Sequence, residues 1–131
     1  MLASPELSDK ELAQISPLVM AYIGDAVYEL AVRSRKVLDR TGKIRDIHRE
    51  VVGLVNAEKQ AQFLRKIEDR LTEEEMAVVK RGRNAKTHSV PRHAGTADYR
   101  WSTGLEALFG YLYLKGDEER LREILEMIDF T

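Results

Sequence analysis

Hydrophobic residues recur at helical spacing along most of the chain, and no stretch of useful length alternates as a strand would. The spacing predicts six helical segments. They are a short one opened by SDKE at residues 8–11, one from 17 to about 38, one from about 44 to 67 with a kink at Gly53 or Asn56, one opened by TEEE at residue 72, one from about 97 to 114, and a last one capped by Asp117. The pattern predicts an all-α protein with a single domain.

The segment AYIGDAVYEL, residues 21–30, contains two residues that do not suit a buried helix face. Its apolar positions predict a core stripe formed by Tyr22, Ile23, Ala26, Val27 and Leu30. A glycine inside a helix costs about 1 kcal/mol relative to alanine, so Gly24 indicates that another backbone approaches closely there. Asp25 is either part of a functional site or a solvated, ion-paired surface residue beside a tight helix crossing.

A second carboxylate lies in the apolar segment STGLEALFGYL, residues 102–112. Glu106 has glycines on both sides, Gly104 and Gly110. Two carboxylates on two apolar helices favour one shared acidic site formed by Asp25 and Glu106. Carboxylate oxygens without competing nitrogen or sulfur ligands are typical of a site for a hard cation such as Mg²⁺.

Composition narrows the class of protein. The chain has 131 residues, of which 44% are hydrophobic and 33% charged, as expected for one globular domain. It has no cysteine, which excludes disulfides and thiolate metal sites. The apolar runs are too short for a membrane span, and the first residues do not resemble a signal peptide. We therefore expect a cytoplasmic protein.

The charge distribution indicates a nucleic-acid partner, although the net charge is only −1. No acid occurs between Met76 and Ala97, a range that carries five lysines and arginines. A solvated helix end, where cations are favoured, is the alternative interpretation. The three histidines lack the spacing of a zinc site. The residues predicted to contact nucleic-acid phosphates are Lys80, Arg81, Arg83, Asn84, Lys86, Thr87, His88 and Arg92.

These motifs together resemble the ribonuclease III family. YIGDAVYEL resembles the family signature that supplies a catalytic aspartate, and LEALFGYLYL resembles its second motif, which supplies a glutamate. LVNAEKQA, residues 54–61, resembles the stretch between them, so that the resemblance covers nearly the whole chain. It departs from the family where Ala21 and Thr103 stand in place of two further acids. The chain is most similar to the short bacterial branch, Mini-ribonuclease III, which shares these departures.

The resemblance implies a homodimeric, Mg²⁺-dependent endoribonuclease that cleaves double-stranded RNA, with Asp25 and Glu106 as catalytic residues and metal ligands. It further implies that residues 1–131 form one catalytic domain without a double-stranded-RNA-binding domain, and that the substrate is the precursor of 23S ribosomal RNA, whose ends are trimmed. A ribosomal protein is a candidate partner. Two alternatives stay open at this point: a non-catalytic RNA-binding or ribosome-assembly factor, and a helical protein-interaction module.

Overall fold

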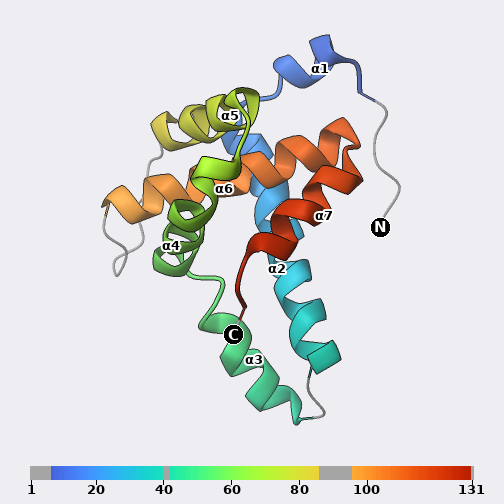
Figure 1. Ribbon diagram of the computed structural model, residues 1–131, viewed down its shortest axis with the longest axis vertical. Coiled ribbons are helices and arrows are strands. Elements are labelled where there is room, and N and C mark those ends of the chain that lie inside the picture. Colours follow the sequence, from blue (N-terminus) through green and yellow to red (C-terminus); the bar gives the residue numbers. More distant parts are fainter. Residues whose placement is uncertain (1–6, 40–41, 86–95, 131) are drawn as a thin grey trace.

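The computed structural model describes residues 7–39, 42–85 and 96–130, and within these ranges all regular structure is helical (Figure 1). This confirms the all-α prediction. In chain order the elements are α1 (Asp9–Ala13), α2 (Pro17–Asp39), α3 (Ile44–Val52), α4 (Ala57–Ile67), the 3₁₀ turn η1 (Glu68–Arg70), α5 (Glu73–Asn84), α6 (Thr96–Lys115) and α7 (Glu118–Met127). No helix in this part of the chain combines the length and the apolar character needed to cross a membrane.

Side chains cap most of the helices where the sequence predicts. Ser8 and Thr72 form reciprocal capping boxes with Glu11 and Glu75, and the Asp117 carboxylate accepts from the amide of Arg120. The segment from 44 to 67 is two separate helices rather than the one kinked helix that the pattern predicts. The break lies between α3 and α4, where Asn56 caps α4 through its side chain.

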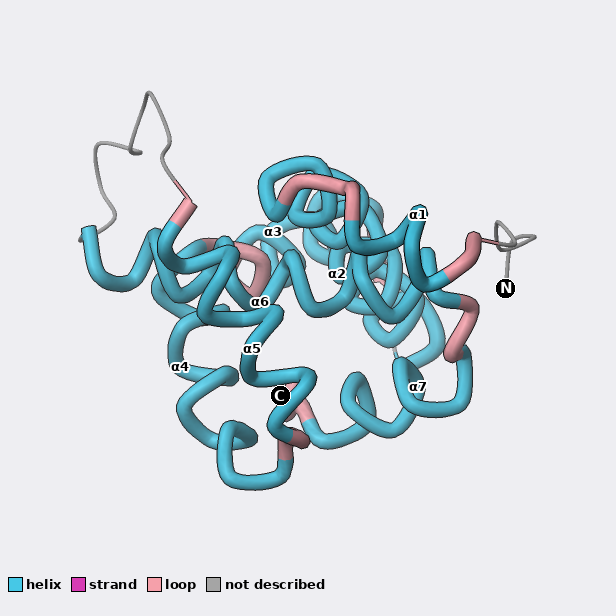
Figure 2. The backbone as a smooth tube through the Cα atoms, turned by 90° about the horizontal axis from the view of Figure 1, so that it is seen from above, coloured by secondary structure: helices cyan, strands magenta, loops and turns pink. Residues whose placement is uncertain are grey.

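Helix α6 is the centre of the core. Figure 1 shows α6 running across α2, with α4 and α5 to either side of it, and Figure 2 shows the same bundle in a perpendicular view. Leu105, Leu108 and Phe109 of α6 are fully buried. The ring of Tyr28 from α2 stacks on Phe109, with 5.5 Å between centroids. The core therefore forms around the same two helices that carry the two unusual carboxylates.

The buried face of α2 differs from the predicted stripe. Tyr22 and Leu30, predicted as core, are 83% and 51% exposed. The helix instead packs through Met20, Gly24 and Tyr28, which are spaced four residues apart. The prediction was wrong at these two positions because a methionine, a glycine and a tyrosine make the core contact, which leaves a row of apolar side chains outside.

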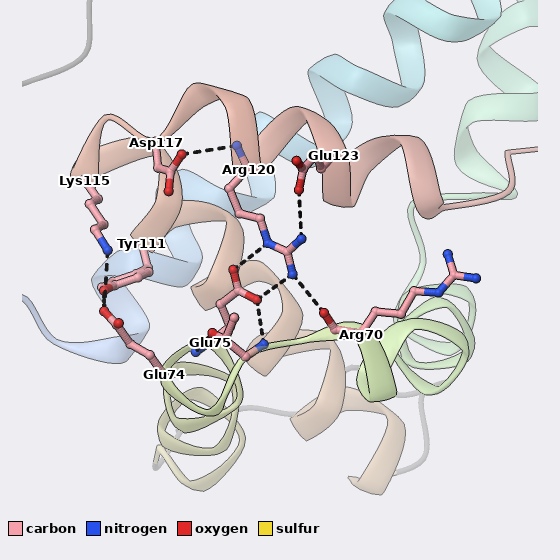
Figure 3. A network of polar contacts seen from close by, with 9 residues as sticks. Arg70, Glu74, Glu75, Tyr111, Lys115, Asp117, Arg120 and Glu123 are labelled. Carbon is pink, nitrogen blue, oxygen red and sulfur yellow. Dashed lines mark hydrogen bonds and ion pairs between the residues drawn. The ribbon is translucent and has the colours of Figure 1, made fainter.

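A polar network joins α5 to α7 (Figure 3). The guanidinium of Arg120 donates to both carboxylate oxygens of Glu75, each at 2.8 Å, and to the backbone carbonyl of Arg70 at 2.9 Å. Nearby, the Tyr111 hydroxyl donates to Glu74, which also pairs with Lys115. These contacts fix the N-terminal end of α5 against the rest of the bundle.

Candidate active site

The site begins with a close crossing of two backbones. A Cβ atom added at Gly24 would overlap the carbonyl oxygen of Glu106 and lie 2.8 Å from the amide nitrogen of Gly110. A Cβ at Gly110 would overlap the carbonyl oxygen of Met20 in the same way. The two glycines thus let α2 and α6 touch directly, which confirms the close approach predicted from Gly24. The crossing places Asp25 beside Glu106.

The two carboxyl groups interact within this crossing. Asp25 is exposed and Glu106 is half-buried, and the two side chains are hydrogen-bonded to each other. Burial raises the pKa of Glu106 to about 9, and the hydrogen bond to Asp25 and its negative charge contribute in the same direction. Two carboxyl groups this close cannot both ionise without a large cost unless a cation compensates. Near neutral pH the metal-free pair therefore shares one proton, which a bound cation would displace.

The donor set fits a hard divalent cation that keeps part of its water shell. Asp25 and Glu106 offer oxygen ligands from two rigid helices, as Mg²⁺ prefers. One turn earlier on each helix, Ala21 and Thr103 are buried, and the Thr103 hydroxyl donates to the backbone carbonyl of Tyr99 at 3.0 Å. Within the described ranges no three histidine, aspartate or glutamate side chains converge. Water would thus complete the coordination of any ion held here.

Two further residues of the site were missed by the sequence reasoning. Gln60 of α4 is only 2% exposed, and its side chain lies near the Glu106 carboxyl, whose pKa it lowers. Tyr28 donates its hydroxyl to the carbonyl of Leu54 at 3.2 Å, and burial, with the charge of Glu106, raises its pKa. A signal for Gln60 did exist, because a polar residue stands in register with the buried Leu64 and Ile67.

The basic residues predicted to bind RNA lie partly in α5. Gly82 packs against α6, since a Cβ there would lie 2.9 Å from the Cα of Gly104. Arg83 stacks over the ring of Trp101, with its Cζ 4.6 Å from the centroid, whereas Arg81 faces a groove beside α1. The structure therefore places these two arginines on different sides of α5. Lys80 and Asn84 are exposed, while Lys86, Thr87, His88 and Arg92 lie outside the described residues.

Comparison with known proteins agrees with this geometry. The model of the ribonuclease III domain matches residues 18–117. A Mini-ribonuclease 3 from a Thermoanaerobacter species is 46% identical over 127 residues, covering 96% of this chain and 89% of that protein. The Mini-ribonuclease 3 of Symbiobacterium thermophilum is 48% identical over 112 residues, 86% of each chain. A crystal structure of a Fusobacterium nucleatum protein superposes with a TM-score of 0.78 at 34% identity, covering 86% of this chain and 90% of that one.

The matches span the helices that carry Asp25, Glu106 and the described part of the basic segment. The identities extend over most of each relative's length, and the fold of the Fusobacterium protein is the same. The chain therefore belongs to the ribonuclease III family of endoribonucleases acting on double-stranded RNA, and within it to the Mini-ribonuclease 3 branch.

Proposed function

We propose that this endoribonuclease hydrolyses RNA at a Mg²⁺ centre held by Asp25 and Glu106. The observation that carries the proposal is the direct contact between these two carboxyl groups at the crossing of α2 and α6. A surface carboxylate with no function has no reason to lie against a second, half-buried one. The family is generally dependent on divalent metal ions, which agrees with an acidic pair.

Each residue has a distinct part in the chemistry. A divalent cation lowers the pKa of a bound water and neutralises charge that develops on the phosphate. Asp25 is exposed on α2, so an ion held there would be open to an RNA phosphate from solvent. Glu106, fixed by the packing of α6, would hold the ion in one position. Because Ala21 and Thr103 supply no carboxylate, we expect weaker Mg²⁺ affinity than a site with four acids would give.

We also propose that the active form is a homodimer assembled through α2. The exposed side chains at positions 18, 22, 26, 30 and 38 form one row along this helix, and all but Ala26 are large apolar residues. Such a row is atypical of a monomer surface. A twofold axis through it would place two Asp25–Glu106 pairs on one assembly, and two sites are what cleavage of both strands requires.

The basic side chains of α5 and the segment after it would hold the duplex. Arginine and lysine contacts to phosphates favour recognition of the A-form shape over sequence. We propose that the natural duplex is formed by the ends of the 23S ribosomal RNA precursor, that a ribosomal protein presents it, and that the reaction takes place in the cytoplasm. The support for this substrate is the membership of the Mini-ribonuclease 3 branch.

The site proposal is tested with labelled duplex RNA, in the presence and absence of Mg²⁺. Asp25→Asn and Glu106→Gln should each bind the duplex with the wild-type affinity and cut it at least about 10²-fold more slowly. Glu58→Gln, a change at an exposed glutamate of α4, is the matched control and should cut normally. Cleavage by either site variant at the wild-type rate would remove Asp25 or Glu106 from the mechanism.

The substrate proposal needs a separate comparison. The duplex formed by the 23S precursor ends and a random duplex of equal length are incubated with the enzyme, and the product ends are mapped. We expect cuts at the mature termini in the first and scattered cuts in the second. Equal and unspecific cutting of both, with or without ribosomal proteins, would leave the nuclease activity in place and reject this substrate.

A further inference from the structure

Gln60 is a buried polar residue on an otherwise apolar helix face. Its neighbours on the inner side of α4 are Ala61, Leu64 and Ile67, each at most 2% exposed. Burying an amide group without hydrogen-bond partners costs about 1–3 kcal/mol. Leucine or methionine would fill the same space without that cost. Packing alone therefore does not explain a glutamine at this position.

The polar group near the amide of Gln60 is the carboxyl group of Glu106. Its side chain lies against the Glu106 carboxyl and favours the ionised form, opposite in direction to burial and to Asp25. Its Nε2 group is buried and has no hydrogen-bond partner among the described residues. The N–H groups of this amide are thus available to an ionised Glu106.

The position of Gln60 is set by the start of α4. The Asn56 side chain accepts from the amide of Lys59 at 2.9 Å and caps the helix. The Tyr28 hydroxyl, anchored in the core between Phe63 and Phe109, holds the carbonyl of Leu54 just before that cap. Gln60 follows one turn after Asn56, so its side chain is presented to α6 from a fixed backbone.

We propose that Gln60 is the positioning residue of the metal centre: its Nε2 donates to one oxygen of Glu106 and leaves the other oxygen for the cation. This inference rests on the proposed role of Asp25 and Glu106 as ligands. A neutral donor suits the task, because a lysine or arginine would compete with the cation for the carboxylate. An apolar residue would leave the ionised carboxylate without a donor. Partners of this kind, behind the ligands, typically change metal affinity 10–100-fold.

The test measures Mn²⁺ binding to the protein without RNA, by calorimetry or by electron paramagnetic resonance. Gln60→Met keeps the volume and removes the donor, and it should weaken Mn²⁺ binding by about 10–100-fold. In EDTA the melting temperature should stay unchanged or rise, since a buried amide is lost. Gln62→Met, two residues further on α4 and partly exposed, is the matched control and should bind normally.

The outcomes separate this inference from the proposed function. If Asp25→Asn and Glu106→Gln lose Mn²⁺ binding while Gln60→Met keeps the wild-type affinity, only the role of Gln60 is rejected. If neither carboxylate variant changes Mn²⁺ binding, or the wild type binds none, the metal centre itself is rejected, and Gln60 with it. Should Gln60→Met fail to fold, Gln60→Ala is measured in the same way, and the same loss of affinity is expected.

Discussion

Gly24 of α2 lies directly against the backbone carbonyl of Glu106 in α6, with no room for a β-carbon between them. We predict that Gly24→Ala separates the two helices and destabilises the fold by about 3 kcal/mol or more, since overpacking in a rigid core costs 1–3 kcal/mol even when side chains can adjust. At Gly24 the added methyl group would meet backbone atoms of α6, which cannot adjust as a side chain can. Urea denaturation of the variant measures the loss.

The matched control for this prediction is Gly53→Ala. Gly53 has helical backbone angles, and its nearest obstacle to a Cβ is 3.5 Å away. Alanine there should leave the stability unchanged or raise it by about 0.5 kcal/mol. Equal stabilities for the two alanine variants would show that the crossing is looser than the structure has it.

Glu106 makes the stability of the metal-free protein depend on pH. Its pKa is raised to about 9 in the fold, mainly by burial, above its value in the unfolded chain. The folded state therefore binds the extra proton between about pH 4.5 and 9, and stability falls as the pH rises through this window. We predict that Glu106→Gln, measured in EDTA, is more stable than the wild type by at least about 1 kcal/mol at pH 8.

The pH dependence of that difference is the informative measurement. At pH 4 the wild-type carboxyl is protonated in both states, so the advantage of Glu106→Gln should disappear. Glu58→Gln, at an exposed position, should show no such trend. A constant difference between wild type and Glu106→Gln across the whole pH range would indicate packing rather than ionisation as its cause.

The contact between Arg120 and Glu75 makes the stability of the fold depend on pH in the opposite direction. Arg120 donates twice to Glu75, whose side chain is 7% exposed, and this lowers the pKa of Glu75. The contact stabilises the fold above the ordinary carboxyl range and is lost as the pH falls through the lowered pKa. We predict that Arg120→Met costs about 2–3 kcal/mol at pH 7, because it leaves a buried carboxylate unpaired.

Thermal melts between pH 3 and 7 check this prediction. The wild type should lose more stability on acidification than Arg120→Met, because the variant has no pair left to lose. Arg33→Ala is the control, since Arg33 pairs with Glu29 at 3.6 Å on the surface, and its loss should cost less than about 0.5 kcal/mol. Parallel pH curves for wild type and Arg120→Met would contradict the assigned role.

The sequence predicts the fold well where the signals are local. Both capping boxes and the Asp117 cap stand where their residues indicate, because a cap depends on atoms three positions apart. The buried face of α2 could not be read in this way. Its apolar residues cover more than one side of the helix, and only the glycine crossing, a contact with α6, decides which side turns inward.

The residues of the candidate site also differ in how far the sequence predicts them. The motifs identified Asp25 and Glu106, and the structure brings their carboxyl groups together. Gln60 was missed because its role depends on a neighbour in another helix, although its place on an apolar stripe was visible in the sequence. The basic segment was recognised from its charge, but the division of Arg81 and Arg83 between two sides of α5 follows from Gly82 facing α6.

The exposed row on α2 leads to a prediction about assembly. Tyr22 is 83% exposed and lies toward the N-terminal end of the row, in the same part of α2 as Asp25. We predict that Tyr22→Glu converts a dimer into a monomer, because it places a charge in an apolar interface. Analytical ultracentrifugation measures the change. Ala77→Glu adds the same charge at an exposed position of α5 and should leave the dimer intact; a monomeric wild type would reject the interface.

The division of the arginines on α5 leads to the last prediction. Arg83 is held by Trp101 and by its bond to Asn84 Oδ1 at 3.0 Å, so it is ordered before RNA arrives. We predict that Arg83→Ala, in an Asp25→Asn background that prevents cleavage, weakens duplex binding and lowers the slope of log affinity against log salt by about 0.7–0.9, as expected for one lost phosphate contact.

Arg81→Ala should act in the same way if the duplex also spans the groove beside α1. Arg122→Ala, an exposed arginine on α7, is the control and should change neither affinity nor slope. Slopes that are identical in all three variants would show that the basic end of α5 does not contact the backbone of the RNA.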